Sequence, residues 1–419
     1  MGIDIIILAI ATLIGLYMAA NIGGNDLANA MGTSVGSGAI TLKQAVLISI
    51  IANTLGAILA GGYVTSTISK GMIDPALFAG DSGRFMIGMF AALVSAGIWV
   101  NIATFFGLPV STTHAIVGAV VGFGVISVGA GSVSWDRIIT IAISWVISPA
   151  VGALIAGGIY YFIEKKILST EDPSKESEHY APVFIFLVFL VLILSVIFKG
   201  LKNLHFEVGF FQTILLAIPV AALAAAFGRG WVRWQIHRDL EPEPGQQQGH
   251  TSVEGLFAHL QVLTACYVAF AHGANDVANA IGPLAAIFSV ITTKSVALQV
   301  EVSFWMLFIG GIAVGGGLLA FGTRVMETIG KDITEITPTR GFCAEFGAAT
   351  TILICSRLGL PVSTTHVLVG AVVGVGLMRG MSALDLRILK NIGLSWVVTL
   401  PFTILLSMFL YKLLTFFLL

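Results

Sequence analysis

Charged residues are scarce in this sequence. Asp, Glu, Lys and Arg make up 10% of the 419 residues, whereas soluble globular domains carry about a quarter. Hydrophobic residues reach 57%, so the composition excludes a soluble protein and predicts a chain that crosses a lipid bilayer several times. The net charge of -1 leaves no basic surface, which also excludes nucleic-acid binding.

Cysteine is nearly absent, with three residues in the whole chain. The number is odd and all three lie in apolar runs, so a disulfide framework is excluded. A basic segment is also missing in front of the first apolar run, which carries Asp4. Residues 1–20 therefore predict a first membrane helix, with a retained signal anchor as the alternative.

Long apolar segments are what the sequence does have, and we count about twelve of them. A bilayer core takes roughly 20 apolar residues to cross, so the shorter segments predict half-helices or re-entrant pieces. The expected fold is an all-α polytopic membrane protein with broken or re-entrant helices.

Two polar stretches, 164–180 and 228–250, predict solvated loops on one side of the membrane, because two crossings separate them. Counting crossings from these loops places 13 of the 21 Lys and Arg residues on that side, which makes it cytoplasmic by the positive-inside rule. We expect a multi-pass protein of the plasma membrane with both termini outside and the central loop 229–255 in the cytoplasm.

An internal duplication is visible in two pairs of segments. The octet GLPVSTTH opens both 107–124 and 359–376, which agree at 15 of 18 positions with an offset of 252. Segments 21–30 and 271–280 agree at six of ten positions with an offset of 250. Two unrelated segments that recur in the same order at nearly the same offset indicate duplication.

The orientation of the two copies follows from the crossings between them. We count seven apolar segments between the first GND and the second AND, and an odd number means that the copies enter the membrane from opposite faces. Inverted-topology repeats are typical of secondary transporters, with the binding site at the repeat interface. We divide the chain into a first repeat at 1–163, a central segment at 164–255 and a second repeat at 256–419.

Two acidic residues, Asp26 and Asp276, lie within apolar segments in the pattern G-x-N-D-x-A-N. A carboxylate at the bilayer centre costs about 2.5–3.5 kcal/mol, which argues for a function. The alternative is a helix N-cap. Amide and carboxylate oxygens suit a hard cation such as Na+. The residues predicted to bind sodium are Asn25, Asp26, Asn275 and Asp276, with Asn29 and Asn279 in support.

The two octets place a proline before three hydroxyl residues at a predicted helix start. Free amides at a helix N-terminus, together with rotatable hydroxyls, suit a tetrahedral oxyanion. The alternative is that the hydroxyls bond back to helix carbonyls. The residues predicted to bind this anion are Ser111, Thr112, Thr113, Ser363, Thr364 and Thr365.

Three further residues are candidates for a supporting or coupling role. His114 and His366 end the octets, and each could relay protons or orient its neighbours. Glu345 stands alone in an apolar segment, and its counterpart at the offset of 252 is Leu93. This asymmetry indicates coupling or gating, with snorkelling near the interface as the alternative.

Thr113 and His114 are adjacent and so project from different helix sides, which argues against a nucleophile–base pair and an enzyme.

These motifs resemble those of the inorganic phosphate transporter (PiT) family. The resemblance rests on GGNDLANA at 23–30, GANDVANA at 273–280 and both octets. It implies phosphate uptake coupled to Na+ in some members and to protons in others, and it implies a homodimer with termini outside. The residues that match the family's motif acids are Asp26, Asp276 and Glu345. Asn53 stands where animal members have a glutamate.

The hypothesis from the sequence is therefore phosphate import by symport with Na+, which also serves to neutralise the anion because the motifs hold no Lys or Arg. The expected partners are phosphate, Na+ or H+, the lipid bilayer and a second copy of the chain, without any cofactor. Proton-coupled uptake, transport of another tetrahedral oxyanion such as sulfate, and a channel remain as alternatives.

Overall fold

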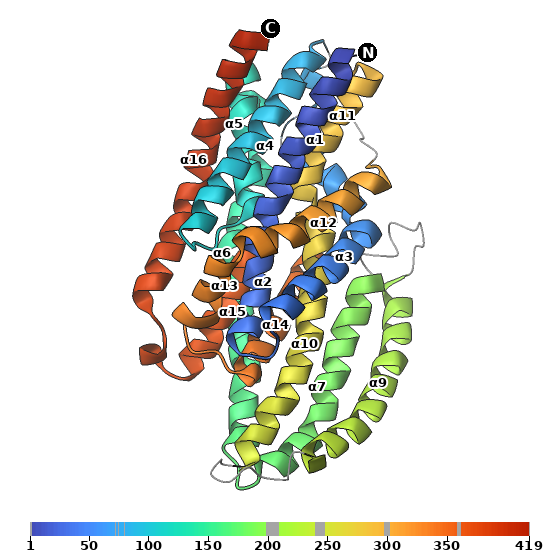
Figure 1. The fold of residues 1–419 in the computed structure, drawn as a ribbon, viewed down its shortest axis with the longest axis vertical. Helices are drawn as coiled ribbons and strands as arrows, with labels where there is room; N and C mark the ends of the chain where they lie inside the picture. The colour runs from blue at the N-terminus through green and yellow to red at the C-terminus, as the bar shows by residue number, and fades with distance from the viewer. Residues whose placement is uncertain are drawn as a thin grey trace.

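The structure is a computed structural model that describes residues 2–71, 73, 75–78, 80–197, 209–238, 248–296, 302–357 and 362–418. These residues are almost entirely helical (Figure 1). The elements of the first half are α1 (Gly2–Ile22), η1 (Gly23–Leu27), α2 (Ala28–Gly36), α3 (Leu42–Gly71), η2 (Pro75–Phe78), α4 (Ser82–Phe105), α5 (Thr112–Val128), η3 (Ala130–Ser132), α6 (Trp135–Ile163) and η4 (Glu164–Leu168). Those that follow are α7 (Pro173–Ser195), α9 (Phe210–Arg238), α10 (Gln248–Asp276), α11 (Ala278–Thr293), α12 (Phe304–Phe321), α13 (Thr323–Glu327), η6 (Thr328–Asp332), α14 (Pro338–Arg357), α15 (Thr364–Met378), η7 (Met381–Ala383) and α16 (Leu386–Leu418).

Apolar helices of membrane-spanning length confirm the predicted fold class. Within the described ranges, nine helical segments are long and apolar enough to cross a bilayer, and α5 and α15 are shorter apolar helices. Two of the nine join two helices into one continuous path: α1 runs through η1 into α2, and α10 runs into α11.

The two long paths are interrupted at the duplicated acidic motifs. Between α1 and α2 the chain forms one π-helical turn, Gly23–Leu27, and between α10 and α11 the helical hydrogen bonding is disturbed at Val277, whose own backbone angles stay helical. A π turn within a helix widens the backbone and is common at functional sites. A third interruption, the non-helical stretch 106–111, separates α4 from α5. The chain break predicted before the helix start of the first octet is therefore confirmed, while 358–361, before the second octet, lie outside the described residues.

The two halves of the chain pack crosswise. Helix α5 of the first half packs on α16 of the second, and α15 of the second half packs on α6 of the first. Gly118 and Gly122 of α5 meet Leu400, Thr403 and Ile404 of α16 closely, since a Cβ on either glycine would overlap these residues. At the offset of 252, Gly370 and Gly374 of α15 make the same approach to the backbone of α6. Small residues spaced by four are typical of close membrane helix pairs.

A second reciprocal pair surrounds the acidic motifs. Gly23 lies against the backbone of Val314 in α12, and Gly273 lies against the backbone of Asn53 in α3. A Cβ on either glycine would overlap the facing carbonyl oxygen. Each motif is thus held by the helix that follows the other motif in sequence, so the duplication found in the sequence is also a duplication of contacts.

The central helices lie to one side of this core. α7 and α9 pack against each other, and α7 also contacts α10; both lie at the lower right in Figure 1. α9 exposes large apolar side chains, including Phe211 and Phe227, as expected of a helix that faces lipid. The two chain ends lie at the same end of the molecule in Figure 1, opposite the connection between α6 and α7.

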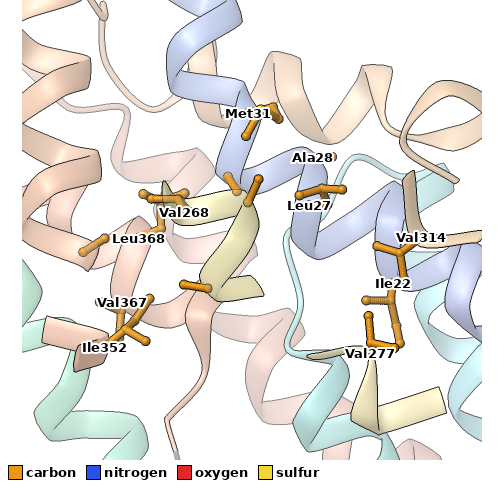
Figure 2. Close-up of a cluster of buried hydrophobic side chains, with 14 of the residues drawn as sticks. Ile22, Leu27, Ala28, Met31, Val268, Val277, Val314, Ile352, Val367 and Leu368 are labelled. Atoms are coloured by element: carbon orange, nitrogen blue, oxygen red, sulfur yellow. The ribbon is translucent and has the colours of Figure 1, made fainter. Parts of the chain in front are cut away.

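Apolar side chains from both halves surround the helix breaks. Ile22, Leu27 and Met31 of the first path are fully buried, and they lie near Val314 of α12 and Val268 of α10 (Figure 2). The polar side chains of the acidic motifs are therefore enclosed by a close-packed apolar shell, in which any charge without a partner is unfavourable.

Candidate functional site

Asp26 lies between hydroxyl groups from both halves of the chain. Its side chain is buried in the π turn, with 4% of its surface exposed. Thr365 Oγ1 donates to Asp26 Oδ1 at 2.6 Å, and Thr112 Oγ1 donates to Asp26 Oδ2. A single carboxylate therefore joins the beginning of α5 to the beginning of α15.

Asp276 occupies the equivalent position at the end of α10 and is also buried. Thr364 Oγ1, the counterpart of the Thr112 hydroxyl, donates to Asp276 Oδ2 at 3.0 Å. His272 Nε2 lies 3.5 Å from the same carboxylate oxygen. The oxygen and nitrogen ligand atoms of Asp26, His272 and Asp276 all lie within 4.8 Å of one another, a grouping that could hold a metal ion.

The two supporting asparagines connect the halves crosswise. Asn29 Nδ2 donates to Thr365 Oγ1 at 3.1 Å. Asn279 Nδ2 donates to Thr112 Oγ1 at 3.2 Å and to Thr113 Oγ1 at 3.1 Å. Each asparagine thus contacts the octet of the other half, so Asp26, Asn29 and both octets come together at one place.

Asn25 lies apart from this group. Its Nδ2 donates to Thr104 Oγ1 at 2.9 Å and to the Leu108 carbonyl at 3.0 Å, and its Oδ1 accepts from the Val110 amide at 2.9 Å. The side chain therefore holds the non-helical segment between α4 and α5 and does not line the cavity described next. Asn275 is half-buried.

A small cavity of about 10 Å³ lies beside Asp26, which is space for about one water-sized particle. Its polar lining comes from Asp26, Asn29, His272 and Thr364, and the rest is apolar. Asn29 Oδ1 and His272 Nε2 are buried and make no hydrogen bond within the described part of the chain. Carboxylates and orphaned acceptors at one small cavity favour a positively charged ligand, because a cation satisfies acceptors that a neutral donor network does not reach.

The serines of the two octets are helix N-caps. Ser111 Oγ accepts from the His114 amide and Ser363 Oγ accepts from the His366 amide, both at 3.2 Å. The backbone angles agree closely, with φ, ψ of -86°, 116° and -85°, 116°. The threonine hydroxyls, which back-bonding would have turned to their own helix, instead reach the acidic motifs. The predicted helix starts are confirmed.

His114 and His366 belong to a cluster of four aromatic rings. Their ring centroids lie 4.5 Å apart, with Trp145 3.6 Å from His114 and Trp396 3.7 Å from His366. The four ring nitrogens make no hydrogen bond within the described ranges. These histidines therefore meet each other edge to face, and His366 stacks on Trp396.

Glu345 is fully buried in α14. Its Oε1 accepts from Thr33 at 2.7 Å, Ser34 at 2.6 Å and Gln261 at 3.1 Å, and its Oε2 accepts from Thr264 at 2.6 Å. A carboxylate enclosed by four donors does not snorkel, so that interpretation of the sequence is wrong. Glu345 instead joins α14 to α2 and α10, and α2 is the helix that begins at the broken motif.

Sequence reasoning missed His272 and the donors around Glu345. His272 stands four residues before Asp276, a spacing that places both on one helix face and could have identified it. The donors come from α2 and α10, and no spacing in the sequence connects them to α14. Glu301 lies outside the described residues, as does the side chain of Arg357.

A profile of the phosphate transporter family matches residues 22–407, which include both pairs of motifs. The chain belongs to this family. The resemblance found in the sequence is therefore confirmed, and the protein is a membrane transporter rather than an enzyme.

Similar proteins come from distant organisms. A candidate phosphate permease of Pyrococcus abyssi is 44% identical over 97% of this chain and 98% of its own length. The chloroplast inorganic phosphate transporter 2-1 of Arabidopsis thaliana is 42% identical over 94% of this chain and 70% of its own. A solved structure titled the sodium-dependent phosphate transporter matches with a TM-score of 0.88 and 41% identity, over 98% of this chain and 100% of that one.

Proposed function

We propose that this transporter imports inorganic phosphate by symport with Na+. The observation that carries the proposal is the set of acceptors at the small cavity: Asp26, Asn29 Oδ1 and the nearby Asp276. Hard oxygen ligands suit Na+. The similarity to a sodium-dependent phosphate transporter supports the same ion.

The hydrogen bonds of the threonines suggest why the two substrates are coupled. Thr112, Thr364 and Thr365 each donate their hydroxyl proton to a motif carboxylate. A hydroxyl has one proton, so these donors are committed and two anionic groups would repel phosphate. Na+ at the carboxylates neutralises them and releases the hydroxyls to donate to phosphate. Phosphate then binds well only after sodium.

The residues divide into two roles in this proposal. Asp26, Asp276 and Asn29 bind sodium, with Asn279, the counterpart of Asn29, and Asn275 in support. The hydroxyls of Thr112, Thr113, Thr364 and Thr365, with the capped first turns behind Ser111 and Ser363, bind phosphate. Asn25 acts through the segment it holds, because its Oδ1 already accepts the Val110 amide.

Alternating access is part of the proposal. The crosswise packing of α5 on α16 and of α15 on α6 supports two repeats of opposite orientation that rock against each other around the shared site. We assign 1–163 and 256–419 to the repeats and 164–255 to a connecting segment. Glu345 would couple the cation site to this motion, because α2 cannot move relative to α10 and α14 without breaking its hydrogen bonds.

The proposal also covers the setting of the protein. We place both termini outside the plasma membrane and the connection between α9 and α10 in the cytoplasm, with two copies forming a homodimer. The loop expected at 229–255 is shorter than the sequence predicted, because residues 229–238 belong to α9 and residues 248–255 to α10. The common position of the two chain ends supports termini on one side (Figure 1). Labelling of single cysteines at residue 4 and in the loop, in intact cells, checks the orientation.

Uptake of radioactive phosphate into liposomes that contain the purified protein provides the decisive measurement. An inward Na+ gradient should drive accumulation, and K+ at equal concentration should not. Asp26→Asn and Asp276→Asn should each weaken apparent Na+ affinity, because a buried charge pair that loses one charge costs about 2–5 kcal/mol, roughly 30-fold or more. Asp136→Asn, at an exposed position on α6, is the matched control.

Four outcomes would contradict the proposal. If a K+ gradient drove wild-type uptake equally well, Na+ would not be the coupling ion. Uptake driven by a pH jump without Na+ would favour proton coupling. Full sodium-driven uptake by both variants would show that the Asp26 and Asp276 carboxylates do not bind the coupling ion. Sulfate that competes as well as phosphate would change the substrate to tetrahedral oxyanions in general.

A further inference from the structure

The hydrogen bonds around His272 determine which of its ring nitrogens carries the proton. Asn53 Nδ2 lies 3.1 Å from the Gly311 carbonyl oxygen, which can only accept. The amide oxygen of Asn53 therefore points the other way, where it lies 3.0 Å from His272 Nδ1. An amide oxygen is an acceptor, so Nδ1 is the donor and carries the hydrogen. In the neutral ring this leaves Nε2 with a free lone pair.

That lone pair is directed toward the acidic pair. His272 Nε2 is buried, makes no hydrogen bond in the described part of the structure, and lies 3.5 Å from Asp276 Oδ2. Two acceptors at this distance repel unless a positive ion lies between them. Ligands at about 2.0–2.2 Å from a tetrahedral metal stand about 3.3–3.6 Å apart, so the observed separation matches one edge of such a site.

The surrounding contacts match those of a metal-binding histidine. Such a histidine donates its second nitrogen to a carbonyl or carboxylate, which fixes the tautomer and the ring orientation. Asn53 performs this role for His272, and the Gly311 carbonyl in turn fixes Asn53. His272 and Asp26 both line the cavity of about 10 Å³, which is large enough for one ion. Three independent features therefore converge: an unpaired buried lone pair, a cavity and an oriented ring.

We propose that His272, Asp26 and Asp276 form a binding site for a divalent d-block cation such as Co2+, Zn2+ or Mn2+. Imidazole nitrogen is a good ligand for these metals, whereas Na+ prefers oxygen. The site overlaps the sodium position, so the inference rests on the proposed function in one respect: the divalent ion competes with Na+ and inhibits sodium-driven uptake. Co2+ binding itself does not depend on transport.

Optical spectroscopy with Co2+ alone tests the site on the purified full-length protein with its affinity tag removed. A protein-bound Co2+ ion with a histidine ligand gives visible absorption bands that hydrated Co2+ lacks at the same concentration. We expect these bands to saturate at one equivalent per chain and to decline as Na+ is added. His272→Gln keeps a polar side chain without the imidazole, and it should weaken Co2+ binding at least tenfold.

Two further variants control for misfolding of His272→Gln and for Co2+ binding at another histidine. Asn53→Leu leaves His272 in place and removes only its orienting partner, so it should lower Co2+ affinity about 10- to 100-fold. His259→Gln removes an exposed histidine of the same helix and should bind Co2+ like the wild type. Thermal unfolding in detergent identifies a variant that has not folded, and Asn53→Leu then replaces His272→Gln as the deciding variant.

The outcomes separate this inference from the proposed function. Absence of Co2+ bands in the wild type, or equal binding by His272→Gln and wild type, overturns the metal site even when uptake is sodium-driven. Co2+ binding that depends on His272 and Asn53 sustains the site even when uptake proves to be independent of Na+. Binding that is unaffected by Na+ overturns the overlap of the two cation positions.

Discussion

The two halves of the site share their acid–threonine pairs and their serine helix caps, and they differ in the polarity of two other buried side chains. Asp26 with Thr112 and Asp276 with Thr364 are equivalent hydrogen-bonded pairs, and the serine caps have nearly equal backbone angles. At the offsets of the repeat, however, His272 corresponds to Ile22. Both side chains are buried, so the difference lies in polarity and not in exposure.

Glu345 shows the same asymmetry, since its counterpart Leu93 is a fully buried apolar residue of α4. The second half therefore carries an imidazole and a carboxylate where the first half has hydrocarbon. Duplicated helix caps and close helix contacts build the scaffold, and single substitutions in one copy make it asymmetric. Matched substitutions of a shared feature should therefore have equal effects in the two halves. Substitutions of His272 or Glu345 have no matched substitution in the first half, because the counterpart residues there are apolar.

The largest effect should come from the close helix contacts. Gly23→Ala and Gly273→Ala each place a Cβ on a facing backbone carbonyl, which a rotamer change cannot relieve. We expect each to lower the free energy of unfolding by about 3 kcal/mol, measured from unfolding in detergent. Gly316→Ala, where a Cβ meets no atom within 4 Å, is the control. A much milder effect at one of the two motif glycines would break the equivalence of the halves.

Glu345→Leu copies the first half into the second. The change removes the acceptor of Thr33, Ser34 and Gln261. A buried donor left unsatisfied costs about 1–3 kcal/mol, but the two hydroxyls can turn to carbonyls of their own helix, so the total stays below that of the glycine variants. We expect a clear loss of stability, and a smaller one for Glu345→Gln, which keeps one acceptor oxygen. Equal thermal unfolding of both variants and the wild type would show that the network contributes no stability.

A pair of threonines compares the two octets directly. Thr365 donates to the Asp26 carboxylate, whereas its counterpart, Thr113, accepts from the neutral Asn279 amide. Bonds to charged groups contribute about 1.5–3 kcal/mol and neutral ones about 0.5–1.5 kcal/mol. Thr365→Val should therefore lower the unfolding temperature more than Thr113→Val. The reverse order would mean that Asp26 is neutral in the resting protein.

The smallest effect should come from the ring stack. Trp396 Nε1 donates to the Pro109 carbonyl at 2.9 Å, and its ring stacks on His366. Trp396→Phe keeps an aromatic ring and loses the hydrogen bond, so stability should fall by about 0.5–1.5 kcal/mol. Phosphate uptake at saturating Na+ should change little. A collapse of uptake at normal stability would assign the stack a direct role in transport.

Much of the fold and part of the site could be predicted from particular residues. The apolar runs predicted the membrane helices, and proline followed by three hydroxyl residues predicted the starts of α5 and α15. The repeated acids predicted a shared site. The network of Glu345 could not be predicted, because its donors come from α2 and α10 and depend on which helices pack beside α14. His272 could have been predicted from its spacing of four residues to Asp276, but its partner Asn53 could not.

By itself, the sequence determined that the chain lies in a membrane, that it is duplicated, and that its motifs combine carboxylates with hydroxyls. These properties follow from composition and from spacing along the chain. The free energy of transfer into lipid depends on composition, and the helix face that a residue occupies depends on spacing. Only the tertiary structure decided that Asp26 binds hydroxyls of both halves and that Asn53 fixes the tautomer of His272. Such contacts depend on the crosswise packing of helices about 250 residues apart, and local propensity carries no information about that distance.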